Sequence, residues 1–132
     1  MPTTARRGLV VISDDEHDIR LILRLALERA GFEVHETGNG EETFRAALAL
    51  RPTVITTDIL EPEFSGLHAM AMLKADAATC DIPVVVVTCM HDPVHRNKAM
   101  ALGAVDYLTK PMSVSAYVRA VQAAASTSEL VG

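Results

Sequence analysis

The sequence predicts an α/β fold in which five strands of a parallel sheet alternate with five helices. Three observations support this prediction. Short β-branched runs occur at residues 9–13 and 54–57, and residues 84–87 are four consecutive valines. Between such runs, apolar residues recur at the spacing of helices that bury one face. This alternation is typical of a parallel sheet with helices on both faces, and the valine run fits a central strand because central strands are buried on both sides.

Each predicted strand is a short apolar or alternating run that ends next to residues favouring turns. Residues 9–13 open the chain as a buried run, and residues 32–36 alternate apolar and polar side chains. The predicted strand that contains the four valines begins at Pro83 and ends at Thr88. The predicted strands cover residues 9–13, 32–36, 54–57, 83–88 and 104–108.

The predicted helices are marked by their ends and by one apolar face. Glycine favours helix termination, whereas Ser and Asn side chains cap the first turn. Asn39 with Glu42 forms a capping-box pattern. The helix ends are assigned to Gly31 and Gly103, and the caps to Asn39, Ser65 and Ser113. The third and fourth helices are expected over residues 66–75 and 94–102, and the apolar residues assigned to the second and last helices are Phe44, Ala47, Leu48, Val114, Tyr117, Val118 and Val121.

These elements predict βαβ units with right-handed crossovers and a parallel sheet covered on both faces, which is a flavodoxin-like, doubly wound fold. The strand order expected for that fold is 2-1-3-4-5. We expect one domain over residues 1–132 with a core of about 8–126, and frayed residues from 126 onward.

Composition excludes several classes of function. The chain has 12 Lys and Arg against 17 Asp and Glu, a net charge of −5, which argues against direct nucleic-acid binding. No apolar run reaches the roughly 18 residues of a membrane span, so we expect a cytoplasmic protein without membrane insertion. Cys80 and Cys89 lack metal-ligand spacing and are expected to be reduced thiols.

Polar side chains follow four of the predicted strands. Asp14 and Asp15 follow the first, Asp58 the third, Thr88 ends the fourth and Lys110 follows the fifth. The carboxyl ends of parallel strands meet at one edge of the sheet, where ligands bind. Carboxylates gathered there repel one another unless a cation is present, and their hard oxygens suit Mg²⁺. Asp58 is best placed to act as a nucleophile toward a phosphoryl group.

The same residues resemble the receiver domain of a two-component response regulator, of the stand-alone type. The resemblance spans nearly the whole chain. It rests on the pair Asp14 and Asp15, on Asp58 followed by Pro62 and Gly66, on Thr88 after the valine strand, and on residues 103–111, which read Gly-Ala-Val-Asp-Tyr-Leu-Thr-Lys-Pro.

The resemblance implies a signalling switch rather than an enzyme with an external substrate. Asp58 would accept a phosphoryl group from a sensor histidine kinase or a histidine phosphotransfer protein. Asp15 and the main-chain carbonyl of Leu60 would help Asp58 to hold Mg²⁺, with Asp14 acting through water. Thr88 and Lys110 would bind the phosphoryl oxygens, and the peptide between Lys110 and Pro111 would be cis. Thr88 and Tyr107 would act as switch residues. Output to a protein target would pass through the face of the fourth helix, fifth strand and fifth helix.

Four positions depart from the family pattern, and one of them, Met112 in place of a common phenylalanine, is interpreted as a packing change only. Glu61 stands before Pro62, where an apolar residue is usual, and this carboxylate could alter metal and phosphoryl binding. Leu60 and Met90 are apolar where many relatives orient the hydrolytic water, which predicts slow loss of phosphate. The main alternative function is a receiver-like binding module that works without phosphate, and the observation that favours it is the extra carboxylate of Glu61.

Enzymes on similar folds are a further alternative class. A phosphatase of the haloacid dehalogenase type would need an acid where Leu60 stands, and a dinucleotide binder would need a glycine-rich turn where Asp14 and Asp15 stand.

Overall fold

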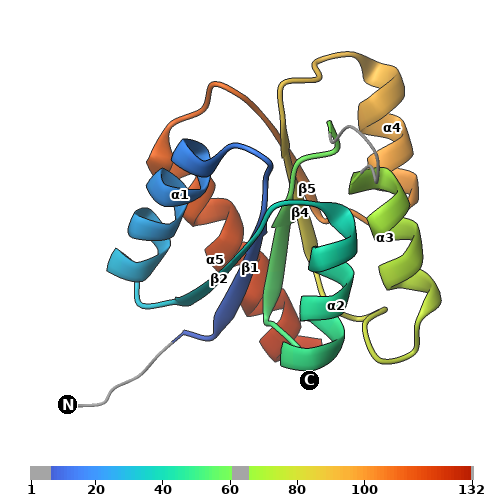
Figure 1. Ribbon diagram of the computed structural model, residues 1–132, viewed down its shortest axis with the longest axis horizontal. Helices are drawn as coiled ribbons and strands as arrows, with labels where there is room; N and C mark the ends of the chain where they lie inside the picture. Colours follow the sequence, from blue (N-terminus) through green and yellow to red (C-terminus); the bar gives the residue numbers. More distant parts are fainter. Residues whose placement is uncertain (1–6, 61–65, 132) are drawn as a thin grey trace.

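The computed structural model describes residues 7–60 and 66–131, in which five strands and five helices alternate (Figure 1). The strands are β1 (Leu9–Ser13), β2 (Glu33–Thr37), β3 (Val54–Thr57), β4 (Val84–Thr88) and β5 (Asp106–Thr109). The helices are α1 (His17–Arg29), α2 (Gly40–Leu50), α3 (Gly66–Ala75), α4 (Pro93–Ala101) and α5 (Val114–Val131).

The strands form one parallel sheet in the order β2-β1-β3-β4-β5, which confirms the predicted flavodoxin-like topology. In the register, Ser13 at the end of β1 lies beside Thr37 of β2 and Thr57 of β3. Thr88 at the end of β4 lies beside Thr109 of β5. The strands therefore end at a common edge, and the loops that follow them are brought together.

The sheet separates two hydrophobic clusters, because alternate residues of a strand point to opposite faces. Val10 and Ile12 pack with α1 and α5, whereas Val11 packs with α2, α3 and α4. Figure 1 shows the same division, with α1 and α5 on one side of the sheet and the other three helices on the opposite side. The four valines of β4 contribute to both clusters and are all buried, as the sequence predicts.

Three strands begin later than predicted: β4 starts at Val84 rather than residue 83, and the starts of β2 and β5 are set by the way the preceding helices end. At the end of α1, Gly31 has a φ of +98° and the amide of Phe32 donates to the carbonyl of Leu27. At the end of α4, the amide of Ala104 donates in the same way to the carbonyl of Ala99. These are Schellman motifs, which use the residue after the glycine to close the helix. Strand pairing therefore starts at Glu33 rather than residue 32, and at Asp106 rather than residue 104.

Two helix boundaries also differ from the predictions. Helix α4 begins at Pro93 because Asp92 caps it and accepts from the amide of His95 at 3.1 Å. Helix α5 continues to Val131, so it extends past residue 126, from which fraying was predicted. The predicted cap Ser65 lies outside the described residues. Ser113 does cap α5, since its hydroxyl accepts from the amide of Ala116 at 3.0 Å.

The sequence predicts that Phe44, Ala47 and Leu48 form the buried face of helix α2, and this prediction is wrong for Leu48. Asn39 caps the helix as predicted, but the Glu42 carboxylate accepts from the amide of Gly38 rather than from that of Asn39. Leu48 is exposed, whereas Thr43 and Ala46 are buried beside Ala47. Small side chains face the sheet here, which lets the helix pack closely, and the larger Leu48 is turned outward. Phe44 is half-buried against the same cluster.

No helix within the described ranges is both long enough and apolar enough to cross a bilayer.

Candidate functional site

The loops at the carboxyl edge of the sheet bring the predicted site residues together. Asp14 follows β1 directly, Asp58 follows β3, Thr88 is the last residue of β4 and Lys110 follows β5. Asp14, Asp58 and Thr88 are buried, whereas Asp15 is exposed. The convergence is a consequence of the parallel topology, which places the ends of all these strands at one edge.

The ammonium group of Lys110 joins the two buried carboxylates. Its Nζ donates to Asp14 Oδ2 at 2.6 Å and to Asp58 Oδ2 at 3.0 Å. The side chains of Asp14 and Asp58 are 2% and 5% exposed, and that of Lys110 is 11% exposed. Burying two carboxylates near each other is costly unless a cation lies between them, and Lys110 provides that cation.

The pKa directions at the site follow from burial and from this pairing. Burial raises the pKa of the Asp14 carboxyl, although hydrogen bonds from Lys110 and from the Glu16 amide act in the opposite direction. Burial alone would lower the pKa of Lys110, but its hydrogen bonds to Asp14 and Asp58 outweigh that effect and raise it. Lys110 is therefore charged throughout the physiological pH range.

The Asp58 carboxylate is held by two donors. While Oδ2 accepts from Lys110, Oδ1 accepts from the main-chain amide of Leu60 at 2.8 Å. Gly66 allows α3 to start close by, since a Cβ at this position would lie 2.2 Å from the carbonyl oxygen of Asp58. The acid is thus fixed in direction at the point where β3 meets the following loop.

Thr88 and Tyr107 are connected through the main chain of Met90. The Met90 amide donates to Thr88 Oγ1 at 3.4 Å, and the Met90 carbonyl accepts from the Tyr107 hydroxyl at 2.8 Å. The Tyr107 ring is buried, and the Arg96 guanidinium of α4 lies 5.6 Å from its centre. A displacement of Thr88 would therefore reach both β5 and α4.

The acidic residues at this edge fit a divalent cation. One carboxylate oxygen each from Asp14, Asp15 and Glu16 can be chosen such that all three lie within 4.8 Å of one another. Hard oxygen donors of this kind are the ligands that Mg²⁺ prefers. Among the described residues, Lys110 pairs with the carboxylates of Asp14 and Asp58, whereas Asp15 and Glu16 add two further carboxylates beside Asp14, so added positive charge is favourable there.

An apolar pocket of about 340 Å³ lies beside Lys110, between α1 and the start of α5. The peptide bond between Lys110 and Pro111 at its margin is cis. Cys89, which follows Thr88, lines the pocket with an exposed thiol, and Cys80 is also free. The other residues that line it are Ile19, Ile22, Leu23, Met112 and Val114.

Sequence reasoning missed two residues of this region. Glu16 adds a third carboxylate, and its position directly after Asp14 and Asp15 was an available signal. Arg20 of α1 reaches the carbonyl of Asp14, a contact that no sequence motif marks. Glu61 and Pro62, which carried one predicted departure and part of the resemblance, lie outside the described residues.

The sequence matches a family model described as the response regulator receiver domain over residues 10–122. It is 33% identical over 114 residues to the transcriptional regulatory protein SrrA of Staphylococcus aureus, covering 86% of this chain and 46% of SrrA. The chain thus spans about half the length of that curated relative.

Solved structures agree with this match. A response regulator receiver domain protein from Clostridium thermocellum superposes with a TM-score of 0.87 at 26% identity, covering 95% of this chain and 99% of the other. A putative response regulator from Chloroflexus aurantiacus gives a TM-score of 0.85 at 26% identity, covering 90% and 98%. The chemotaxis protein CheY4 of Vibrio cholerae superposes with a TM-score of 0.84 at 25% identity, covering 91% of this chain and 99% of CheY4.

The parallel sheet, the acidic edge and the match over residues 10–122 lead to one conclusion. The chain belongs to the receiver domain family of response regulators, the proteins of two-component phosphorylation signalling.

Proposed function

We propose that this chain is a phosphorylation-dependent switch in which Asp58 accepts a phosphoryl group from a histidine kinase or a histidine phosphotransfer protein. The observation that carries the proposal is the pair of hydrogen bonds from Lys110 to the buried carboxylates of Asp14 and Asp58. This arrangement supplies a nucleophile beside a fixed positive charge, at the sheet edge where ligands bind.

The chemistry required of Asp58 is a displacement at phosphorus. A carboxylate oxygen forms a bond to phosphorus while the bond from phosphorus to the donor's imidazole nitrogen breaks, and the electron pair stays on that nitrogen. Lys110 is positioned to neutralise the transferred oxygens, and the Thr88 hydroxyl lies at the adjacent strand end to donate a hydrogen bond to them. Asp58, Asp15, Asp14 and the Leu60 carbonyl would hold Mg²⁺, which when bound supplies further neutralisation of phosphoryl charge.

Output would pass through the face formed by α4, β5 and α5. The support for this is the link from the Thr88 hydroxyl through Met90 to Tyr107, which joins the site to β5 and, through Arg96, to α4. Movement of Thr88 toward a phosphoryl group would break or lengthen this link and free the Tyr107 ring to change its packing. The partner on this face would be a protein.

Loss of phosphate from Asp58 should be slow. The exposed Leu60 and the half-buried Met90 offer apolar side chains near the site, and neither can orient an attacking water. The rate of this loss is measured by following the mass peak of the phosphorylated chain after the phosphodonor is removed. A half-life of seconds would contradict the expectation.

The deciding experiment is intact mass spectrometry after incubation with Mg²⁺ and acetyl phosphate. The native chain and the control Asp81→Asn, which changes an exposed acid remote from the site, should each gain one phosphoryl group only when Mg²⁺ is present. Asp58→Asn should gain none. If the folded, Mg²⁺-binding native chain stays unmodified, the proposal is wrong and a phosphate-independent binding module becomes the better assignment, with Glu61 as the next residue to change.

A further inference from the structure

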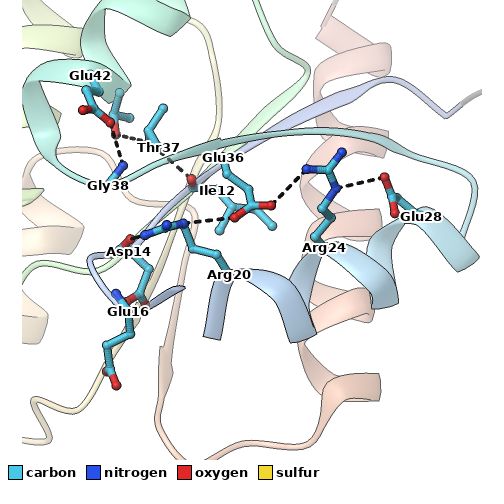
Figure 2. A network of polar contacts seen from close by, with 11 residues as sticks. Ile12, Asp14, Glu16, Arg20, Arg24, Glu28, Glu36, Thr37, Gly38 and Glu42 are labelled. Carbon is cyan, nitrogen blue, oxygen red and sulfur yellow. Dashed lines mark hydrogen bonds and ion pairs between the residues drawn. The ribbon is translucent and has the colours of Figure 1, made fainter. Parts of the chain in front are cut away.

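The side chain of Arg20 connects three parts of the molecule that meet near the acidic edge. From helix α1, its Nε donates to Glu36 Oε1 of β2 at 3.0 Å, and its Nη1 donates to the main-chain carbonyl of Asp14 at 2.7 Å. Figure 2 shows the guanidinium between these two acceptors. The contact to Asp14 is charge-assisted and short, which places it among the stronger hydrogen bonds of a protein.

The carbonyl that Arg20 holds belongs to the peptide unit between Asp14 and Asp15. Because a peptide unit is planar, fixing its oxygen fixes the direction in which the chain enters Asp15. Asp14 is also held at its amide, which donates to the Thr37 carbonyl at 3.2 Å, and at both carboxylate oxygens, which accept from the Glu16 amide and from Lys110. Every hydrogen-bonding group of Asp14 therefore has a partner.

Asp15 depends on this support more than Asp14 does. Its carboxylate is exposed, and within the described ranges it makes no hydrogen bond or ion pair of its own. The main chain is therefore what sets where the Asp15 side chain starts relative to Asp14 and Glu16, and its rotamers then place the carboxylate. Arg20 holds the peptide that precedes Asp15 and so restrains where the Asp15 side chain starts.

The partners of Arg20 keep its charge from opposing a bound cation. Glu36 accepts from Arg20 with one carboxylate oxygen and from Arg24 with the other, at 2.9 Å, and Arg24 in turn binds Glu28 (Figure 2). Two arginines and two glutamates make this network neutral. The Arg20 and Glu36 side chains are only 18% and 20% exposed, so solvent screens this pair less than the outer pair of Arg24 with Glu28.

We propose that Arg20 is a positioning residue for the divalent-cation site, acting by holding the peptide between Asp14 and Asp15 in the orientation that brings the acids together. The inference rests on the proposed function only in taking Mg²⁺ as the cation. Residues that orient metal ligands from behind typically change metal affinity by about 10- to 100-fold when they are replaced.

The chain contains a matched control for this role. Arg24 lies one helical turn after Arg20 and binds the same Glu36, but it does not contact Asp14. Isothermal titration of the unphosphorylated protein with Mg²⁺ alone would compare Arg20→Met with Arg24→Met. We expect Arg20→Met to weaken Mg²⁺ binding about tenfold, and Arg24→Met to change it less than about twofold because exposed ion pairs contribute little.

Thermal unfolding in EDTA separates positioning from a general loss of structure. Both variants lose surface ion pairs, so similar melting temperatures with unequal Mg²⁺ affinity support the proposal. Equal Mg²⁺ affinity in the two variants would overturn it. If Arg20→Met does not fold, Arg20→Lys decides, because a lysine keeps the charge but cannot grip Glu36 and the Asp14 carbonyl as a planar fork. If Arg20→Lys binds Mg²⁺ more weakly than Arg24→Met does, the proposal is supported. If Arg20→Lys binds Mg²⁺ as tightly as the native chain, the proposal is overturned.

Because the readout is cation binding, the two proposals fail separately. A native chain that binds Mg²⁺ but takes no phosphoryl group refutes the switch, while the comparison of Arg20 with Arg24 still stands. A native chain that binds no Mg²⁺ overturns the role of Arg20 directly.

Discussion

Replacing Tyr117 by phenylalanine should destabilise the protein by removing one buried hydrogen bond. Tyr117 of α5 is fully buried, and its hydroxyl lies 2.9 Å from Thr56 Oγ1 of β3. This contact ties α5 to the strand that carries Asp58 two residues later. Tyr117→Phe leaves the hydroxyl of Thr56, which is 1% exposed, without a partner and without access to water.

The expected loss follows from the environment of this pair. A neutral buried hydrogen bond contributes about 1 kcal/mol net, and stranding one partner raises the cost toward 2 kcal/mol. Tyr117→Phe and Thr56→Val should each cost about 1–2 kcal/mol, but together they should cost less than the sum because no polar atom is then left unpaired. Burial raises the pKa of Tyr117, so the phenol stays neutral and the loss should not depend on pH in the mildly acidic to mildly alkaline range.

Urea unfolding followed by circular dichroism measures these free energies, and calorimetry should show each single variant melting roughly 3–8 °C lower. Tyr107→Phe is the matched control. Its hydroxyl bonds to the Met90 carbonyl in a partly exposed position, where water can replace it, so its loss should be smaller. A double variant of Thr56 and Tyr117 whose cost equals the sum of the single costs would refute the reasoning.

Two further predictions concern the site and its surroundings. Gly66→Ala should cost about 1–3 kcal/mol, measured by urea unfolding, because its methyl group would meet the Asp58 main chain, which cannot move aside; an unchanged stability would mean that α3 shifts freely. Hydrogen bonding to Arg24, with a further contribution from Arg20, holds the pKa of Glu36 below 4.5 despite partial burial. The stability from this interaction is thus present above pH 4.5 and lost as the pH falls through the lowered value. Glu36→Gln should therefore lose less free energy of unfolding on acidification than the native chain, and parallel curves would contradict this.

The course of the chain could be predicted from the sequence wherever one local signal dominated. The valine strand β4 and the Asn39 cap of α2 are such cases, since the burial of a valine run and the reach of an asparagine side chain depend little on the rest of the fold. Leu48 shows the limit. Its helical spacing suits either of two neighbouring faces, and only the approach of α2 to the sheet selects the one carrying Thr43 and Ala46.

The composition of the site could be predicted because parallel strands end at one edge, which places Asp14, Asp58 and Lys110 together in any sheet of this order. How they are joined could not. Lysine has a long, flexible side chain, and its contact with both acids depends on distances across three strands. The Arg20 contact is harder still to foresee, because its acceptor is a main-chain carbonyl, which has no signature in the sequence.

The exposed thiol of Cys89 has a practical consequence for work with this protein. It is adjacent to Thr88 and beside the pocket next to Lys110, whereas Cys80 is half-buried with its sulfur 3.7 Å from the Ala77 carbonyl. A thiol-reactive fluorophore should therefore label Cys89 first and report binding at the acidic edge as a change in emission. The same accessibility favours disulfide-linked dimers in oxidising buffers, so labelling stocks and titration samples should be kept reduced until use.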